Sequence, residues 1–204
     1  MAAVKLTKSE LKAQKDHLKQ FQRYLPTLEL KKQQLQLVTI QVQAQKEQLA
    51  RQRDEAAEGL DSWVAVFAEN RAFPPGKRLQ DLVLPDRVVM AEDNIAGVRI
   101  PVFRELTFRD IPYDVADYPL WVDTALVRLR DIAQFDAMIA VLDLQLELLE
   151  KELRATSQRV NLFEKVKIPE AQENIRVITI YLGDQQTMEV VRGKLAKKKL
   201  EEAG

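Results

Sequence analysis

Apolar residues recur every seven positions along two long stretches of the chain, one on each side of a proline-rich middle. The first stretch repeats through Phe21, Leu28, Leu35, Val42, Leu49, Ala56 and Trp63. The second repeats through Ile132, Ile139, Leu146, Leu153 and Val160, with a parallel line of Phe135, Leu142, Leu149, Thr156 and Phe163. A seven-residue repeat places its apolar groups on one stripe of an α-helix, and a partner helix has to cover that stripe. The nearest partner is the other stretch, so we predict a mainly α fold built on a long antiparallel coiled-coil hairpin.

The first helix is predicted over residues 7–68, a stretch rich in Leu, Gln, Lys, Glu and Ala, which favour helices. Thr7 and Glu10 can form a capping box, in which each side chain binds a backbone amide that the helix leaves unpaired. Pro26 lies inside the pattern. Because proline removes one backbone hydrogen bond, we expect a kink there.

The second seam line of this helix is partly basic. It runs through Leu25, Lys32, Thr39, Lys46, Arg53, Leu60 and Phe67. The alkyl stems of the basic residues can cover the seam while their charges reach water. Alternatively the register differs, and Val38 and Val66 face inward instead.

Residues 69–119 have a different character, with repeated prolines that break or bound helices. Val98–Phe108 alternates enough to be a strand, and Asp86–Met90 is a second, shorter candidate. The turn-rich segment Glu92–Gly97 connects them, which predicts a short β-hairpin. Some fifty residues bury little surface, so we expect this central cap to lean on the helix ends, through Trp63, Phe67 and Trp121.

The helical period resumes over residues 120–200, the predicted second coiled-coil helix, and Pro169 interrupts it. Pro169 either kinks or breaks this helix or begins a separate one, because proline suits a first helical turn. Counting outward from the middle places Pro26 opposite Leu162, one heptad from Pro169. The hairpin is therefore expected to bend at one place.

The net charge is zero, but its distribution is uneven. Residues 1–53 hold 11 basic and 4 acidic side chains, residues 54–153 hold 10 and 20, and residues 154–204 hold 10 and 7. A hairpin brings both basic ends to one tip and leaves the acidic middle at the other end. Such asymmetry either serves solubility or indicates different partners at the two ends.

No pattern in the chain indicates catalysis, a cofactor or a metal. There is no cysteine, which fits a reducing cytosol, and His17 is the only histidine. Gly76-Lys77 and Gly193-Lys194 lack the glycine that a phosphate-binding loop carries five residues earlier. No apolar run is long enough to insert into a membrane.

The chain ends in a basic segment. Its lysines are Lys194, Lys197, Lys198 and Lys199. No aromatic residue interleaves them for base stacking, which disfavours nucleic acid as a partner. Two interpretations remain, a solvated helix end and a basic tip that meets an acidic or polar collar of another protein.

The segment that ends at Pro169 resembles the signature of the D subunit of V-type rotary ATPases. The matching residues are Arg159, Val160, Asn161, Glu164, Val166, Ile168 and Pro169, followed by Asn174, Ile175 and the lysines at 194, 197 and 198. In the first helix, Leu28, Leu30, Lys31, Lys32 and Leu35 are similar to the family's leucine- and lysine-rich stretch. In the middle, Asn94–Pro101 resembles its hairpin region. The likeness covers nearly the whole chain. Two departures, at Tyr24–Thr27 where the family often carries a glycine and at Gly183–Thr187 where it is more acidic, suggest a divergent bacterial branch of the family.

This resemblance implies a central-stalk rotor subunit without catalytic residues. It implies that the paired termini enter the hexamer of nucleotide-binding A and B subunits. The middle is implied to lie beside the F subunit and the adaptor protein (C or d type) of the membrane ring. The expected place is then the cytoplasmic side of the membrane, in a complex that couples ATP to proton or sodium transport. The alternative function is a prefoldin-like coiled-coil chaperone subunit, which is also a helix–hairpin–helix protein but has shorter helices with apolar tips.

Overall fold

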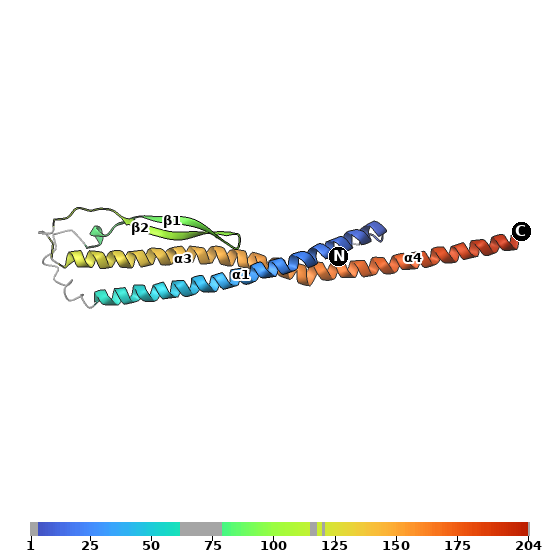
Figure 1. Ribbon diagram of the computed structural model, residues 1–204, viewed down its shortest axis with the longest axis horizontal. Helices are drawn as coiled ribbons and strands as arrows, with labels where there is room; N and C mark the ends of the chain where they lie inside the picture. Colours follow the sequence, from blue (N-terminus) through green and yellow to red (C-terminus); the bar gives the residue numbers. More distant parts are fainter. Residues whose placement is uncertain (1–3, 62–78, 115–117, 120, 204) are drawn as a thin grey trace. The chain divides into compact units, whose positions relative to one another are not determined.

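The computed structural model describes residues 4–61, 79–114, 118–119 and 121–203. Its elements follow one another as α1 (Lys8–Asp61), the short 3-10 helix η2 (Leu79–Leu82), strands β1 (Pro85–Ile95) and β2 (Val98–Phe108), α3 (Val122–Leu162), the π-helical turn η4 (Phe163–Lys167) and α4 (Ile168–Ala203). Figure 1 shows the long helices and the single hairpin. The prediction of a mainly α fold with a short central β-hairpin is confirmed.

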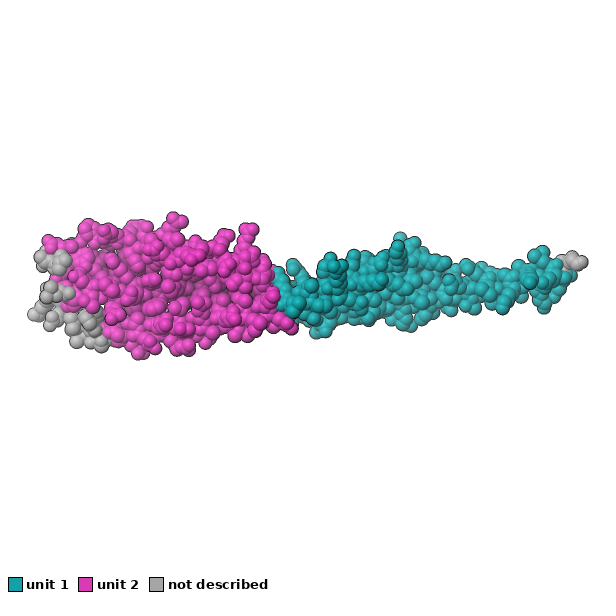
Figure 2. All heavy atoms as spheres, in the orientation of Figure 1, with its two compact units in different colours: residues 1–32, 154–204 teal, residues 33–153 magenta. Residues whose placement is uncertain are grey.

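The chain divides into two compact units, coloured separately in Figure 2. Unit 1 comprises residues 1–32 and 154–204, and unit 2 comprises residues 33–153. Unit 2 contains η2, the hairpin, the second half of α1 and most of α3. Unit 1 contains the start of α1, the end of α3, η4 and α4.

Helix α1 begins at a side-chain cap and continues through its internal proline. The backbone N–H of Glu10 donates to Oγ1 of Thr7 at 3.2 Å, which satisfies one of the amides that a helix start leaves unpaired. Pro26 lies inside the helix, and the hydroxyl of Thr27 donates to the carbonyl oxygen of Tyr24 at 2.7 Å just beside it. Proline thus removes a bond from α1 without ending it.

The hairpin is longer, and its turn tighter, than the sequence predicted. Strand β1 runs to Ile95, so the polar residues from Glu92 onward belong to the strand, and Ala96 and Gly97 alone form the turn. Their φ angles are 52° and 80°. Two consecutive positive φ angles give a turn whose twist matches that of the paired strands. These polar residues are exposed on both faces of the strand, yet each of them still pairs with β2, so the absence of alternation concealed this part of the strand.

The tip of the hairpin is part of the main apolar core of unit 2. Ile100 is only 2% exposed and lies in one cluster with Leu35, Val42, Leu142, Leu146 and Leu149 of the two helices. Ile95, Ala96 and Val98 pack against the same cluster. Figure 1 shows the strands lying alongside α3. The hairpin therefore lies along α3, and its tip reaches the core shared by α1 and α3.

A buried hydrogen bond fixes the edge of β2 against α3. The side-chain Nε2 of Gln145, itself buried, donates to the carbonyl oxygen of Pro101 at 2.5 Å. The N–H and C=O of a strand residue point to the same edge, and proline has no N–H to offer there. This edge of β2 faces α3 and not another strand. Pro101 is therefore tolerated there, because no neighbouring strand needs a backbone N–H from this position.

A second, smaller core in unit 2 joins η2 to the start of α3. It consists of Leu82, Tyr118, Val122 and Leu126, with Trp121 and Tyr113 packed against it. The prediction that Trp121 takes part in the packing of the central segment agrees with this cluster. Trp63 and Phe67, the other two expected contacts, lie outside the described residues, as does Val66.

Candidate functional surfaces

The predicted seam residues lie on the covered side of their helices. Four of them are buried, namely Leu35, Val42, Leu146 and Val160. Seven more are half-buried, namely Phe21, Leu28, Leu49, Ala56, Ile132, Ile139 and Leu153, and Trp63 lies outside the described residues. No described member of the two repeats is exposed, as one stripe facing a partner element requires.

Two of the basic seam positions are paired with acids across the helices of unit 2. Nζ of Lys46 lies 2.5 Å from Oδ1 of Asp143, and Nε of Arg53 lies 3.1 Å from Oδ1 of Asp136. A step of seven residues forward in α1 matches a step of seven back in α3, as in an antiparallel pair. Hydrogen bonds to Asp54 and then Asp136 raise the pKa of Arg53 above its ordinary value.

The alternative register, in which Val38 faces inward, is compatible with these ion pairs. Val38 is half-buried and packs against the main cluster. Lys32, Thr39, Lys46 and Arg53 are half-buried as well. The covered stripe of α1 is wide because the helix contacts both α3 and the hairpin.

In unit 1, aromatic and amide contacts join the start of α1 to the C-terminal helices. The rings of Phe21 and Phe163 lie with centroids 5.3 Å apart, and Nδ2 of Asn174 donates to Oε1 of Gln14 at 3.4 Å. His17 is exposed and stacks on Phe21 at 6.1 Å. The histidine is thus a surface ring beside the seam.

The signature residues lie on and around the π-helical turn. Val160 is buried and Ile168 half-buried, whereas Arg159, Asn161, Glu164 and Pro169 are exposed. Exposed apolar side chains accompany them, namely Leu162 and Val166. The segment therefore presents an outward-facing surface as well as a seam contact.

The basic end of the chain is a helix without cover from the described part of the chain. All side chains from residue 183 to 202 are exposed, including the four lysines of the predicted basic tip, Lys194, Lys197, Lys198 and Lys199. Lys197 and Lys198 lie 3.7 Å and 3.6 Å from Glu201 and Glu202, one turn further on. Met188, Val190, Val191, Leu195 and Leu200 are exposed large apolar residues on the same segment.

An apolar groove on unit 2 was not predicted from the sequence. It has a volume of about 640 Å³ and is lined by Gln33, Gln36, Leu37, Thr39, Ile40 and Leu153. Leu37 and Ile40 are 62% and 66% exposed. The available signal was that both lie off the seven-residue repeat of α1, on a face that an isolated helix pair would keep polar.

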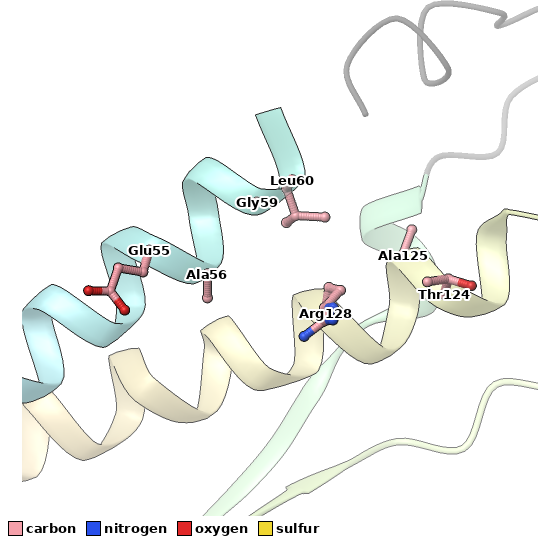
Figure 3. Close-up of a pocket in the computed structure, with 7 residues that line it drawn as sticks. All are labelled: Glu55, Ala56, Gly59, Leu60, Thr124, Ala125 and Arg128. Atoms are coloured by element: carbon pink, nitrogen blue, oxygen red, sulfur yellow. The ribbon is translucent and has the colours of Figure 1, made fainter. Parts of the chain in front are cut away.

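A second pocket, of about 300 Å³, lies between α1 and α3 in unit 2 (Figure 3). Ala56, Gly59 and Ala125 leave this space because their side chains are small or absent. Among the described residues that line it, Glu55 and Arg128 carry charges, and Figure 3 shows their charged groups well apart. The described lining thus lacks the converging polar groups of a catalytic site.

Within the residues that the structure describes, no three His, Cys, Asp or Glu side chains are grouped to hold a metal ion. Over the same residues, no helix combines the length and apolarity needed to span a membrane.

Comparison with known proteins identifies the family. The family model for the ATP synthase D subunit matches residues 10–198. The chain is 44% identical over 200 residues to the V-type ATP synthase D subunit of Borreliella burgdorferi, and the match covers 98% of this chain and 96% of that protein. It is 36% identical over 198 residues to the V-type ATP synthase D subunit of Chlamydia pneumoniae, covering 97% and 93%. The expected resemblance is confirmed, and the chain belongs to the D-subunit family of ATP synthases.

Proposed function

We propose that this chain is the central-stalk rotor subunit of a V-type rotary ATPase or ATP synthase. In this role it carries no catalytic residue and transmits torque between the nucleotide-binding hexamer and the membrane ion-translocating ring. Family membership supports the assignment to the complex. The observation that carries the role within it is the C-terminal part of α4, whose side chains from 183 to 202 are all exposed.

An uncovered helix of this length calls for a partner. Isolated helices gain little stability from propensity alone, and most helices in proteins are held by packing of an apolar face. This segment has exposed apolar residues such as Leu195 beside its lysines. We assign it to a surrounding collar formed by the nucleotide-binding A and B subunits, with the lysines meeting acidic or polar groups.

The groove of unit 2 suits a different partner in the complex. Its exposed Leu37 and Ile40 are an apolar strip on an otherwise polar helix face, and such strips mark protein contacts when several apolar residues adjoin. We assign the groove to the F subunit. We assign the end of unit 2 that contains η2 and the start of α3 to the adaptor protein of the membrane ring. The complex places the chain on the cytoplasmic side of the membrane as a peripheral component.

Two variants of one chain separate these assignments. Truncation after Lys194 removes residues 195–204, whereas Leu37→Gln with Ile40→Gln changes only the groove. Residues 195–202 and positions 37 and 40 are exposed, so each variant is expected to fold. Each is reconstituted with the hexamer, the F subunit and the membrane sector.

The truncation is expected to lower ATP-driven ion transport per ATP hydrolysed while the F subunit still co-purifies. The groove variant is expected to lose the F subunit while retaining binding to the hexamer. Equal loss of both properties in both variants would contradict the assignment of the two surfaces. Full transport by the truncated chain would contradict the rotor role of its C-terminal end.

A further inference from the structure

The covered stripe of the C-terminal helices shifts by one residue at the π-helical turn. Up to Phe163 the seam follows the seven-residue repeat through Leu149 and Thr156, both buried. Continuing that repeat would place positions 170 and 177 on the seam, but both are exposed. The buried residues are Ala171 and Ile178, one position later, and Ile178 is 0% exposed.

The companion line of the seam shows the same shift. Leu153 and Val160 lie on it before the turn. After the turn the half-buried apolar residues are Ile168, Ile175 and Leu182, so Ile168 comes eight positions after Val160 and each later one comes seven positions after the last. The polar residues Lys167 and Asn174 beside them are half-buried as well, whereas Tyr181, the next position of the unshifted repeat, is exposed. One extra residue has therefore been inserted into the repeat between Val160 and Ile168.

Helix α1 contains no such insertion over the part that faces this region in unit 1. Its line runs through Leu25, Leu18 and Leu11 at a constant spacing of seven, and all three are half-buried. Val4, seven positions before Leu11, precedes the helix and is also half-buried. A second line of Phe21 and Gln14 keeps the same spacing. Only the C-terminal side of the pair carries the additional residue.

The π turn is where that residue is accommodated. An inserted residue in an α-helix would rotate everything beyond it by about 100° and turn the stripe away from its partner. In η4 the backbone N–H of Ile168 bonds to the carbonyl oxygen of Phe163, five residues earlier. The wider turn takes up the extra residue, and the stripe on each side remains facing α1.

Pro169 lies two positions after the last residue of the turn and has no N–H to donate. The proline is compatible with the wide turn. The one-residue shift of the seam is an independent reason for the turn to form. If the proline were the sole cause, its replacement would let the helix relax to α geometry. That relaxation would rotate Ala171 and Ile178 out of the seam.

We propose that the π turn at Phe163–Lys167 is a conformational joint. It accommodates one residue more than the seven-residue seam repeat requires. π turns are rare, have poorer hydrogen-bond geometry and recur at functional sites. The helix yields at this turn, by opening its hydrogen bonds, while the seam contacts on both sides stay closed. The joint lets the end of the chain twist relative to α3 without separation of the helix pair.

The experiment uses the full-length chain and three variants. In the first, Pro169→Ala removes the proline alone. In the second, Pro169→Ala is combined with deletion of Lys165, which removes the extra residue and leaves an unbroken α-helix with the seam in phase. The matched control deletes Lys19, which is also an exposed lysine but lies on α1, where the repeat has no extra residue to lose.

Hydrogen exchange and thermal melting provide the readouts. In the unmodified chain, the amides of residues 164–168 are expected to exchange at least about tenfold faster than those of residues 157–161, because local opening is concentrated in weakly bonded segments. Pro169→Ala alone should retain this fast exchange. The deletion of Lys165 with Pro169→Ala should reduce it to the level of the neighbouring residues and raise Tm. Deletion of Lys19 should lower Tm.

Three results would overturn the proposal. Uniform exchange through residues 157–168 in the unmodified chain would mean that the turn does not yield. Loss of fast exchange on Pro169→Ala alone would make the proline its cause. A Tm of the Lys165 deletion as low as that of the Lys19 deletion would mean that the turn holds no extra residue.

Discussion

Nε of Arg53 on α1 lies 3.1 Å from Oδ1 of Asp136 on α3, and the Lys46–Asp143 pair repeats this relationship one heptad away. Opposite charges that recur at matching positions favour one axial alignment of two helices, since a slip along the axis separates every pair at once. The basic seam positions of α1 thus help to specify the antiparallel register of unit 2.

A charge-swap cycle tests this pairing. Arg53→Asp or Asp136→Arg alone is expected to lower the urea midpoint by setting like charges against each other, and the double swap should recover most of the loss. The coupling should weaken with added salt, because the groups are partly exposed. Additive effects of the two single changes, measured at low salt, would show that the pair does not contribute.

Two leucines two positions apart on α1 should differ in how much stability is lost when each is replaced by alanine. Leu35 is 0% exposed in the main cluster, whereas Leu37 is 62% exposed. Leu35→Ala is expected to lower the free energy of unfolding by about 2–5 kcal/mol. Leu37→Ala should change it by less than about 0.5 kcal/mol. Urea denaturation measures both, and similar losses would be incompatible with the burial of this stripe.

Two glycines provide a test of backbone conformation. Gly97 has a φ of 80° in the hairpin turn, where a side chain is unfavourable, so Gly97→Ala should lower stability by about 1–2 kcal/mol. Gly59 lies in α1, and a Cβ there would meet nothing within 4 Å. Gly59→Ala is therefore expected to raise stability by about 0.5–1 kcal/mol. Thermal or urea unfolding measures the stability of both variants. Stability changes of the same sign in the two variants would contradict the prediction.

Tyr113 should titrate at higher pH than an ordinary tyrosine. Its hydroxyl donates to Oδ1 of Asp123, and this bond raises the pKa of Tyr113. Because the folded pKa lies above the unfolded value of about 10, the bond stabilises the fold below about pH 10. This contribution is lost as pH rises through the folded pKa.

The measurement is the ultraviolet absorbance of tyrosinate, compared between the unmodified chain and Tyr113→Phe to isolate one of the four tyrosines. Asp123→Asn should return the pKa towards its usual value. An unchanged titration in Asp123→Asn would mean that the carboxylate does not govern this hydroxyl.

The seven-residue repeats in the sequence predicted which side of each long helix is covered. Leu35, Leu146, Leu149 and Val160 lie on the buried side of their helices, and helical periodicity, a local property of the chain, places such residues on one face. The family signature around Pro169 likewise needed no structure to be identified. The candidate surface at Leu37 and Ile40 was not found, because exposure of an apolar residue depends on which elements come to cover it.

The β-hairpin likewise has one feature that the sequence predicted and others that it did not. Alternation of apolar and polar residues predicted β2, but it could not predict that Ile100 would join the core between α1 and α3. A strand pattern defines which face is apolar and says nothing about what will cover it. The contact with Gln145 through Pro101 is therefore a result of tertiary packing alone.

The sequence by itself determined two long amphipathic helices, a central hairpin, an uneven charge distribution and a family. The tertiary structure decided the partners of the basic seam residues, the position of the hairpin along the helices and the π turn before Pro169. The physical reason is that periodicity and turn chemistry act over neighbouring residues. In contrast, ion pairs, shared cores and the phase of one helix against another exist only once distant segments lie together.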